Sequence, residues 1–193
     1  MQLKTLSLGL AITLASSVTL AAPVDYKIDP THTATVFSWN HFGFSTPSAN
    51  FTNIQGVIKV DNEKPANSSV EVTIPLSSVN TNVAALDKEF QEEAWFNAAK
   101  YPNITFKSTK VETKDKKHFK ITGNLTVKGV TKPVVLNAIL NKQGEHPMAK
   151  VPAIGFNATT SFDRSAFGIG NYVPNVGDKI TVNITTEAKV DKK

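Results

Sequence analysis

The sequence predicts an all-β protein, an eight-stranded antiparallel barrel with one helical segment between strands three and four. Three observations lead to this prediction. Eight segments alternate apolar and polar residues with the period of half-buried strands, and Gly, Pro, Asn or Asp bounds each segment. One further segment has helical spacing. An up-and-down barrel removes exposed sheet edges by closing on itself, so it suits eight consecutive antiparallel strands.

The predicted strands each place their larger apolar residues on one face. The clearest alternation is in residues 69–76, where Val70, Val72 and Ile74 are separated by polar residues. Many inward positions on other strands carry Thr or Ala, which are too small to fill a barrel, and this favours a cavity over a solid interior. The predicted strands are residues 33–41, 51–60, 69–76, 103–113, 118–127, 132–141, 151–163 and 179–190.

The helical segment is residues 82–102. Leu86, Phe90 and Ala94 recur every four residues beside charged residues, so one helix face is apolar. In an antiparallel all-β protein, the available partner for that face is an open end of the barrel. The segment is therefore predicted to be a lid.

The two ends of this segment carry helix-terminating signals. Residues 80–82 have short polar side chains that we expect to cap the first turn, and Pro102 disfavours helix at the residue before it. Trp95 and Phe96 are adjacent, so one regular helix cannot aim both at a single stripe. A break near residues 92–94 is expected, and these aromatics either seal the core or line a cavity mouth.

The first 21 residues resemble a secretory signal. They contain Lys4, a short apolar run and no acidic residue, and cleavage is expected between Ala21 and Ala22. Removing 21 residues from 193 leaves 172, enough for a single domain over residues 22–193. The chain has no cysteine and no second apolar run that predicts a membrane span. A periplasmic location is the simplest expectation.

Charge excludes one large class of function. Without the signal, 20 basic residues stand against 16 acidic ones, a net charge of +4, and Arg164 is the only arginine. Nucleic-acid binders rely on arginine, so no nucleic-acid partner is predicted. One lysine-rich hairpin is either a solvated loop or a weak attraction to anionic lipid or phosphate. Its lysines are Lys107, Lys110, Lys114, Lys116, Lys117 and Lys120.

Neither metal nor catalytic motifs are found in the sequence. His32 and His41 are nine residues apart, so they point to opposite faces of one unbroken strand, and no metal site is predicted. The AFGIGN stretch at residues 166–171 precedes a loop instead of a helix, so it fails as a dinucleotide motif. Asp163 and Arg164 are expected to form an ion pair at the barrel rim. The chain is predicted not to be an enzyme.

Four stretches carry family motifs. They are YKIDPTHTATVFSWNHFGFS at residues 26–45, VNTNVAALDKEFQEEAWFNAAKYPNITFKST at 79–109, ITGNLTVKGVTKPVVL at 121–136, and FDRSAFGIG at 162–170 with VGDKI at 176–180. Together they make the chain resemble the YceI-like family of bacterial lipid and polyisoprenoid-binding proteins over residues 26–190. The resemblance implies a lipocalin-like barrel whose apolar bore holds an isoprenoid chain, such as a quinone tail or a polyprenyl phosphate, without any required cofactor.

The resemblance also implies which residues line the pocket. They are Phe37, Trp39, His41, Leu86, Phe90, Trp95, Phe96, Phe106 and Phe167. This chain departs from the family pattern at the helix, where Glu89 and Gln91 stand at positions that are commonly histidine and arginine. An acidic Glu89 argues against a phosphate head group and favours an uncharged head such as a quinone.

Three functions stay open at this point. The first is a periplasmic carrier or sensor that holds one isoprenoid lipid. The second is a partner-binding module in envelope stress or electron transfer, with a membrane redox protein as partner and the lipid as a structural element. The third is an enzyme acting on the lipid, with His41 or Glu89 as acid or base. Head group, chain length and a homodimeric state are equally open.

Overall fold

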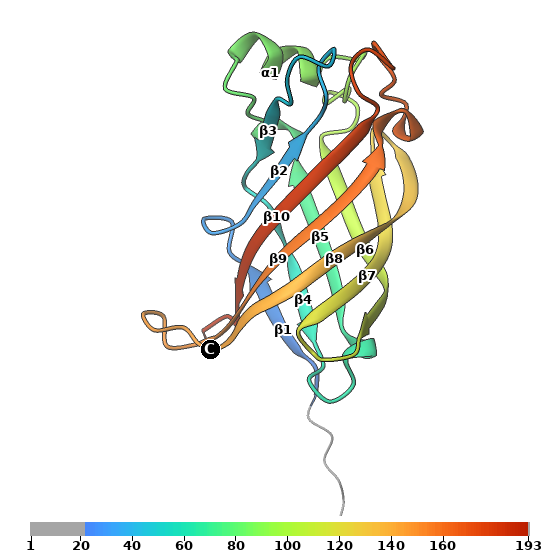
Figure 1. Ribbon diagram of the computed structural model, residues 1–193. Coiled ribbons are helices and arrows are strands. Elements are labelled where there is room, and N and C mark those ends of the chain that lie inside the picture. The colour runs from blue at the N-terminus through green and yellow to red at the C-terminus, as the bar shows by residue number, and fades with distance from the viewer. Residues whose placement is uncertain (1–21, 193) are drawn as a thin grey trace, which may run out of the picture.

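Strands with two-residue alternation build the molecule, which we describe from a computed structural model covering residues 22–192 (Figure 1). The predicted signal peptide, residues 1–21, lies outside the described residues. The strands are β1 (Val24–Ile28), β2 (Ala34–Ser38), β3 (Ser48–Phe51), β4 (Gln55–Val60), β5 (Ser69–Pro75), β6 (Asn103–Thr113), β7 (His118–Val127), β8 (Val130–Glu145), β9 (Pro152–Asp163) and β10 (Lys179–Lys189). The helices are α1 (Ala84–Gln91) and the short 3₁₀ turns η1 (Pro65–Asn67), η2 (Leu76–Ser78) and η3 (Arg164–Phe167).

One antiparallel sheet closes into a barrel. The strand order is β1-β4-β5-β6-β7-β8-β9-β10-β2-β3. Besides β4, β1 also pairs with β10, and this pairing closes the sheet. β1 and β2 are successive parts of one interrupted barrel strand, because β10 pairs with both of them. β3 and β4 likewise form one interrupted strand, because on the side away from β10 β4 pairs with β1 and β3 pairs with β2. The predicted eight-stranded antiparallel barrel is confirmed.

The first two barrel strands differ most from the prediction. The first barrel strand begins at Val24 instead of Thr33, and the second is interrupted at residues 52–54. Both differences arise where the backbone leaves the ladder for a few residues and then rejoins the same neighbour. The inward positions change phase across each break, from Ile28 to Thr33 and from Phe51 to Ile54, so no single run of alternation extends across either break.

A two-residue turn joins β7 to β8. Lys128 and Gly129 both have positive φ, 49° and 75°, as the tight hairpin turn that matches strand twist requires. A Cβ on Gly129 would lie 2.5 Å from the Tyr101 ring, so glycine is needed there for space as well as for φ. The turn thus joins the predicted strands 118–127 and 132–141 as an antiparallel pair and lies against Tyr101.

The helix covers one end of the barrel, as Figure 1 shows at the top. It ends at Gln91, and Glu92 is extended with φ −68° and ψ 164°, so the predicted break near residues 92–94 is confirmed. Turns and irregular chain follow from there to Pro102, so the predicted extent of the helical segment, to Pro102, is wrong. The amide of Phe96 bonds instead to the carbonyl of Phe90, which folds this part back onto α1.

The start of the helix also differs from the prediction. Val83 precedes the helix and no side chain caps the first turn. The Asp87 carboxylate instead reaches back and accepts from the Thr81 amide at 2.6 Å and the Thr81 hydroxyl at 2.7 Å. The polar residues before α1 therefore stabilise the loop that leads into the helix, and they do not cap the amides of its first turn.

The barrel has two unlike ends. We call the end covered by α1, together with the loops at residues 39–47 and 168–178, the lid end. The opposite end, formed by the loops at residues 61–68, 113–118 and 146–150, is the lysine end. Both ends of the described chain lie at the lysine end (Figure 1).

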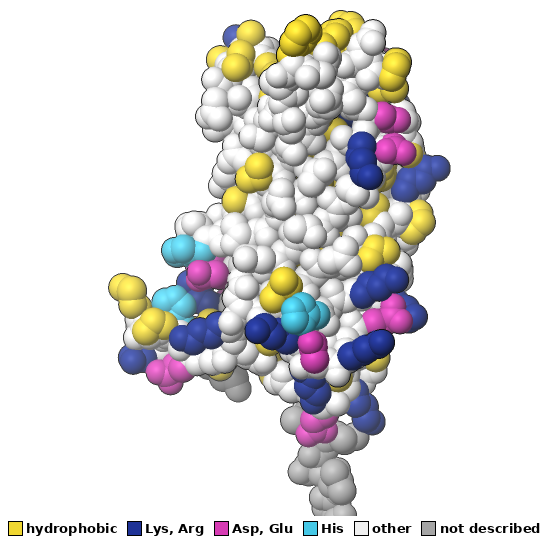
Figure 2. Space-filling view, viewed as in Figure 1, with side chains coloured by type: hydrophobic (Ala, Val, Ile, Leu, Met, Phe, Trp, Pro, Cys, Tyr) yellow, Lys and Arg dark blue, Asp and Glu magenta, His cyan; other side chains and the backbone are white. Residues whose placement is uncertain are grey.

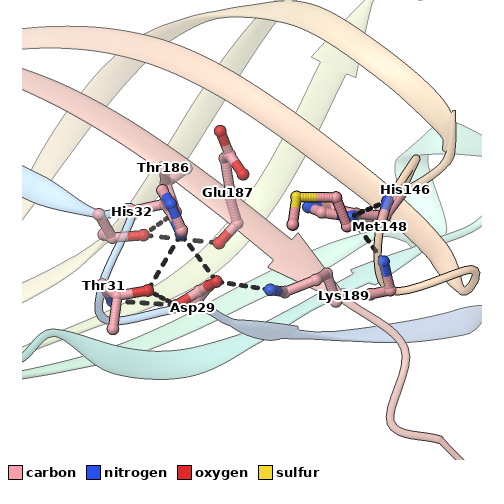
Figure 3. A network of polar contacts seen from close by, with 10 residues as sticks. Asp29, Thr31, His32, His146, Met148, Thr186, Glu187 and Lys189 are labelled. Carbon is pink, nitrogen blue, oxygen red and sulfur yellow. Dashed lines mark hydrogen bonds and ion pairs between the residues drawn. The ribbon is translucent and has the colours of Figure 1, made fainter.

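A polar network holds the interruption between β1 and β2 (Figure 3). The Asp29 carboxylate accepts from Lys189 Nζ at 2.7 Å, from the Thr31 hydroxyl at 2.6 Å and from His32 Nδ1 at 3.0 Å. The Asp29 amide donates to the Glu187 carbonyl at 2.9 Å. Asp29 thereby fastens the turn between two half-strands to β10, the strand that both half-strands pair with.

The Asp29 network predicts acid sensitivity. Lys189 first, and then Thr31, holds the pKa of Asp29 well below its ordinary value. A depressed native pKa stabilises the fold above the unfolded-state pKa of about 3.9, and that stabilisation is lost as pH falls below it. We expect Asp29→Asn to lower the free energy of unfolding by about 2 kcal/mol at pH 7. The difference from wild type should narrow below about pH 3.9.

Urea unfolding at several pH values measures this difference. Asp25→Asn is the matched control, because Asp25 of β1 is 62% exposed and lies 3.6 Å from Nζ of Lys59 on the neighbouring strand β4. An exposed pair of this kind contributes little. Equal losses in both variants, or a pH-independent difference for Asp29→Asn, would contradict the role given to this network.

Candidate functional site

A cavity of about 920 Å³ occupies the barrel and reaches both of its ends. His41 and Trp95 line it at the lid end, and Asn62 and Lys116 line it at the lysine end. Its wall between them consists of inward residues of the strands, on the faces that the alternation predicts. Members of this wall include Ile54, Ile58, Val70, Val72, Ile74, Phe119, Ile121, Leu125, Leu136, Leu140, Ile154, Phe156, Phe162, Ile180, Val182 and Ile184.

Small side chains keep the bore open. Ala138 of β8 and Ala158 of β9 are directly opposite each other in the ladder, and both line the cavity. Thr160 and Thr186 line it from β9 and β10. Because a packed interior would need larger residues at these positions, their size leaves space along the axis. The prediction of a hollow barrel is therefore confirmed.

The nine residues predicted to line a pocket all lie on the wall of this one cavity. Thr35, Phe37 and Trp39 alternate inward from β2 and its extension, whereas Val36 between them is exposed. Phe106 and Phe167 arrive from β6 and η3, and both are buried. Their contact with a ligand stays a prediction.

An aromatic cluster gathers at the lid end. Ring centroids are 5.1 Å apart for Phe37 and Phe51, 5.8 Å for Trp39 and Phe90, and 5.2 Å for Phe90 and Trp95. Phe90 thus connects the helix to the inner face of β2. Such pairs add to the burial of apolar area, so the cluster holds α1 on the barrel. Leu86 and Phe96 border the same space.

Polar groups border the cluster. The Trp95 indole N–H donates to Glu89 Oε1 at 3.0 Å, and the Arg164 guanidinium lies 5.7 Å from the centre of the Trp95 ring. Glu89 and Arg164 both line the cavity. His41 is exposed at the rim, where its backbone forms isolated β-bridges with Ser45 and Val176. The lid end therefore offers a carboxylate, a guanidinium and an imidazole to the polar part of a bound molecule.

Arg164 does not form the predicted ion pair with Asp163. It is buried, and its guanidinium donates to the carbonyls of four residues of the loop at 168–178, namely Gly177, Ile169, Asn171 and Val176, at 2.7 to 3.0 Å. Burial lowers the pKa of Arg164, and the charge of Asp178 opposes that shift. Backbone carbonyls of a folded loop cannot be recognised in the sequence, and the ion pair predicted between Arg164 and Asp163 is therefore wrong.

The lysine end is closed differently. Lys116 Nζ donates to the Asn62 carbonyl at 2.7 Å and so connects the two loops that meet over the bore. Asp115 holds its own loop, because its carboxylate accepts from His118 and Lys117, and these bonds lower the pKa of Asp115. Sequence reasoning missed Asn62 and Lys116 as wall residues. It placed Phe119 and Phe156 on inward faces without assigning them to the site.

Among residues 22–192, no three His, Cys, Asp or Glu side chains gather as a metal site would require. Within the same range, no helix is long and apolar enough to span a membrane. The cavity wall thus supplies mainly apolar contacts, with its polar groups at the two ends. Such a wall suits a long apolar molecule with one small polar part.

Comparisons with known proteins agree with this geometry. A family model described as the YceI-like domain matches residues 26–188. Protein YceI of Escherichia coli O157:H7 is 37% identical over 188 residues, which cover 95% of this chain and 97% of that protein. The crystal structure of a Campylobacter jejuni YceI protein covers 100% of both chains with a TM-score of 0.68 and 26% identity.

A more distant structure shares the fold. A polyisoprenoid binding domain from Saccharophagus degradans is 14% identical, with a TM-score of 0.63 over 86% of this chain and 98% of that domain. The family model and the Escherichia coli relative each span most of the barrel, including the lid and the loop that Arg164 holds. This chain belongs to the YceI-like family.

Proposed function

We propose that the protein is a periplasmic carrier that holds one isoprenoid lipid in the bore of its barrel. The observation that carries this proposal is the hollow, apolar interior of about 920 Å³ that runs from the lid end to the lysine end. The polyisoprenoid binding domain from Saccharophagus degradans, which shares the fold, supports the choice of cargo. The expected signal at residues 1–21 supports the compartment.

The bore suits an elongated chain. β6 has 11 residues, which at about 3.3 Å per residue and a tilt of about 40° span roughly 28 Å along the barrel axis. Burying apolar carbon contributes about 0.8 kcal/mol per methylene, so each five-carbon unit contributes roughly 4 kcal/mol before entropy losses. A few units then suffice for micromolar binding, on the order of 8 kcal/mol.

The polar groups at the lid end favour an uncharged head. Glu89 borders the cavity, and its charge would repel a phosphate. Arg164 would attract one, but four loop carbonyls already take up most of its N–H groups. We therefore propose a quinone, with its tail along the bore and its head near Glu89 and Trp95, over a polyprenyl phosphate.

Native mass spectrometry after mild purification tests the carrier proposal. We expect a co-purified apolar mass, and addition of a long-tailed quinone to delipidated protein should produce a one-to-one complex. A protein that is empty and ignores both added quinone and added polyprenyl phosphate would contradict the proposal.

Filling the bore is expected to weaken cargo binding without unfolding the protein. Ala158→Phe places a ring in the cavity, where empty space accepts it, so we expect at least tenfold weaker quinone binding. The free energy of unfolding should fall by less than about 1.5 kcal/mol. Thr159→Phe is the control, because Thr159 is exposed on the outer face one residue away. Unchanged binding in Ala158→Phe would place the cargo outside the bore.

Charge removal at the lid end is expected to change the preferred head group. Glu89→Gln keeps the acceptor for the Trp95 N–H and removes the negative charge. We expect polyprenyl phosphate to gain about fivefold in affinity relative to quinone, on the order of 1 kcal/mol. Competition binding measures the ratio. Glu93→Gln is the control, because Glu93 is exposed and does not line the cavity. An equal change in both variants would exclude a head group beside Glu89.

A further inference from the structure

Four large apolar side chains are exposed at the lid end. Phe44 is 93% exposed, Tyr172 65%, Val83 53% and Phe42 50%. Figure 2 shows hydrophobic side chains at the top of the molecule, whereas most of the Lys and Arg side chains in this view lie in its lower half. A large aromatic that is almost wholly in water at a loop tip contributes nothing to the folded core, so it indicates a surface that something else covers.

These side chains come from three segments that hydrogen bonds hold together. The Phe42 amide donates to the Asn175 carbonyl at 2.9 Å, which joins the loop at residues 39–47 to the loop at residues 168–178. The Asn171 side-chain amide donates to the Ala94 carbonyl at 2.8 Å, which joins the second loop to the lid. The exposed apolar residues therefore surround one opening.

The turn that carries Phe44 is fixed in shape. Phe42 and Gly43 have φ of 53° and 76°, the Gly43 amide donates to Asn40 Oδ1 at 2.8 Å, and the Phe44 amide donates to the His41 carbonyl at 3.0 Å. Left-handed backbone is uncommon for a bulky aromatic. The turn thus keeps Phe44 projecting outward instead of letting it fold onto the barrel.

The same surface continues into the cavity. Phe42 and Tyr172 are partly exposed and also line the cavity wall, and the Tyr172 ring lies 6.3 Å from that of Trp95. An apolar molecule could thus pass from whatever covers Phe44 into the bore while staying in contact with apolar side chains. This continuity suits the lid end to the exchange of an apolar cargo.

We propose that the lid end docks on the interface of a phospholipid bilayer, with Phe44 and Phe42 inserted among the lipid chains. The proposal rests on the proposed function, since it names the source of the cargo. A second protein copy fits less well, because three aromatics at about 200 Å² each fall short of the roughly 800 Å² that each partner buries in a stable interface. Separate loop tips suit a fluid interface, as aromatic anchors of membrane proteins do.

The charges at the two ends of the barrel determine whether docking needs anionic lipid. The lid at residues 80–102 carries four acidic residues against two lysines, a net charge of −2. Glu92 and Glu93 are exposed just after α1, so anionic lipid would repel the lid weakly. The lysine end has the opposite character, since residues 107–120 carry six lysines against Glu112 and Asp115, a net charge of +4 without histidine. Docking through the lid end therefore requires no anionic lipid, whereas docking through the lysine end would depend on it.

Flotation with phosphatidylcholine vesicles tests the proposal. We expect the full mature chain to float with them, Phe44→Ser to bind about tenfold more weakly, and Phe44→Trp to bind as wild type. Met148→Ser is the matched control, because Met148 is 87% exposed in a loop at the lysine end. Its binding should equal that of wild type.

Three outcomes would overturn the proposal. Phe44→Ser could float as wild type does. Binding could require phosphatidylglycerol and be lost in Lys114→Ser with Lys117→Ser, which would assign docking to the lysine end. Sedimentation could show a wild-type dimer that Phe44→Ser dissociates, which would assign Phe44 to a second copy. Native mass spectrometry of Phe44→Ser separates this proposal from the carrier function, because Phe44 does not line the cavity and the bound mass should be unchanged.

Discussion

β10 pairs with β9 along its whole length and, on its other side, with β2 and then β1. Neither β1 nor β2, at five residues each, is long enough to cover an 11-residue strand alone. Closure of the sheet therefore depends on two half-strands that stay aligned across the turn at residues 29–33. Asp29 gives that alignment, because its carboxylate holds the turn and Lys189 of β10 together. Without closure there is no enclosed space, and every other feature of the site depends on that space.

Once closed, the barrel keeps its interior free because large side chains lie at the lid end and small side chains lie in the middle. Aromatic rings crowd together at the lid end, where Phe37, Trp39 and Phe90 pack against one another. Ala138 and Ala158 leave the middle open. The aromatic cluster provides the stability that a filled core would otherwise supply, and the small residues provide the volume. Stability and capacity are thus assigned to different parts of one wall.

Much of this architecture follows from local sequence pattern. The bounds of β6 and β7 match the predicted strands, because alternation and turn residues both mark their ends. The end of α1 could be predicted because Trp95 and Phe96 cannot share one helix face. The turn held by Asp29 could not, since its partner Lys189 is 160 positions away in the chain. Arg164 was assigned to its neighbour Asp163 for the same reason.

The site was predicted in part, and the missing part has a physical cause. Family motifs and strand alternation identified the aromatic wall at the lid end. Asn62 and Lys116 were missed because a carbonyl and a lysine in two exposed loops have no pattern of their own, and only barrel closure brings them together. Exposure of Phe44 was equally invisible, since an aromatic next to a strand is usually read as core.

Both ends of the described chain emerge at the lysine end, the far side from α1 (Figure 1). A tether attached through either terminus would consequently hold the barrel upright, with its covered opening directed away from the point of attachment. Immobilised on a sensor surface in this way, the protein would present Phe44 and its neighbours to the solution in a single orientation. In a fusion protein, the same placement would aim the opening at whatever lies opposite the anchor.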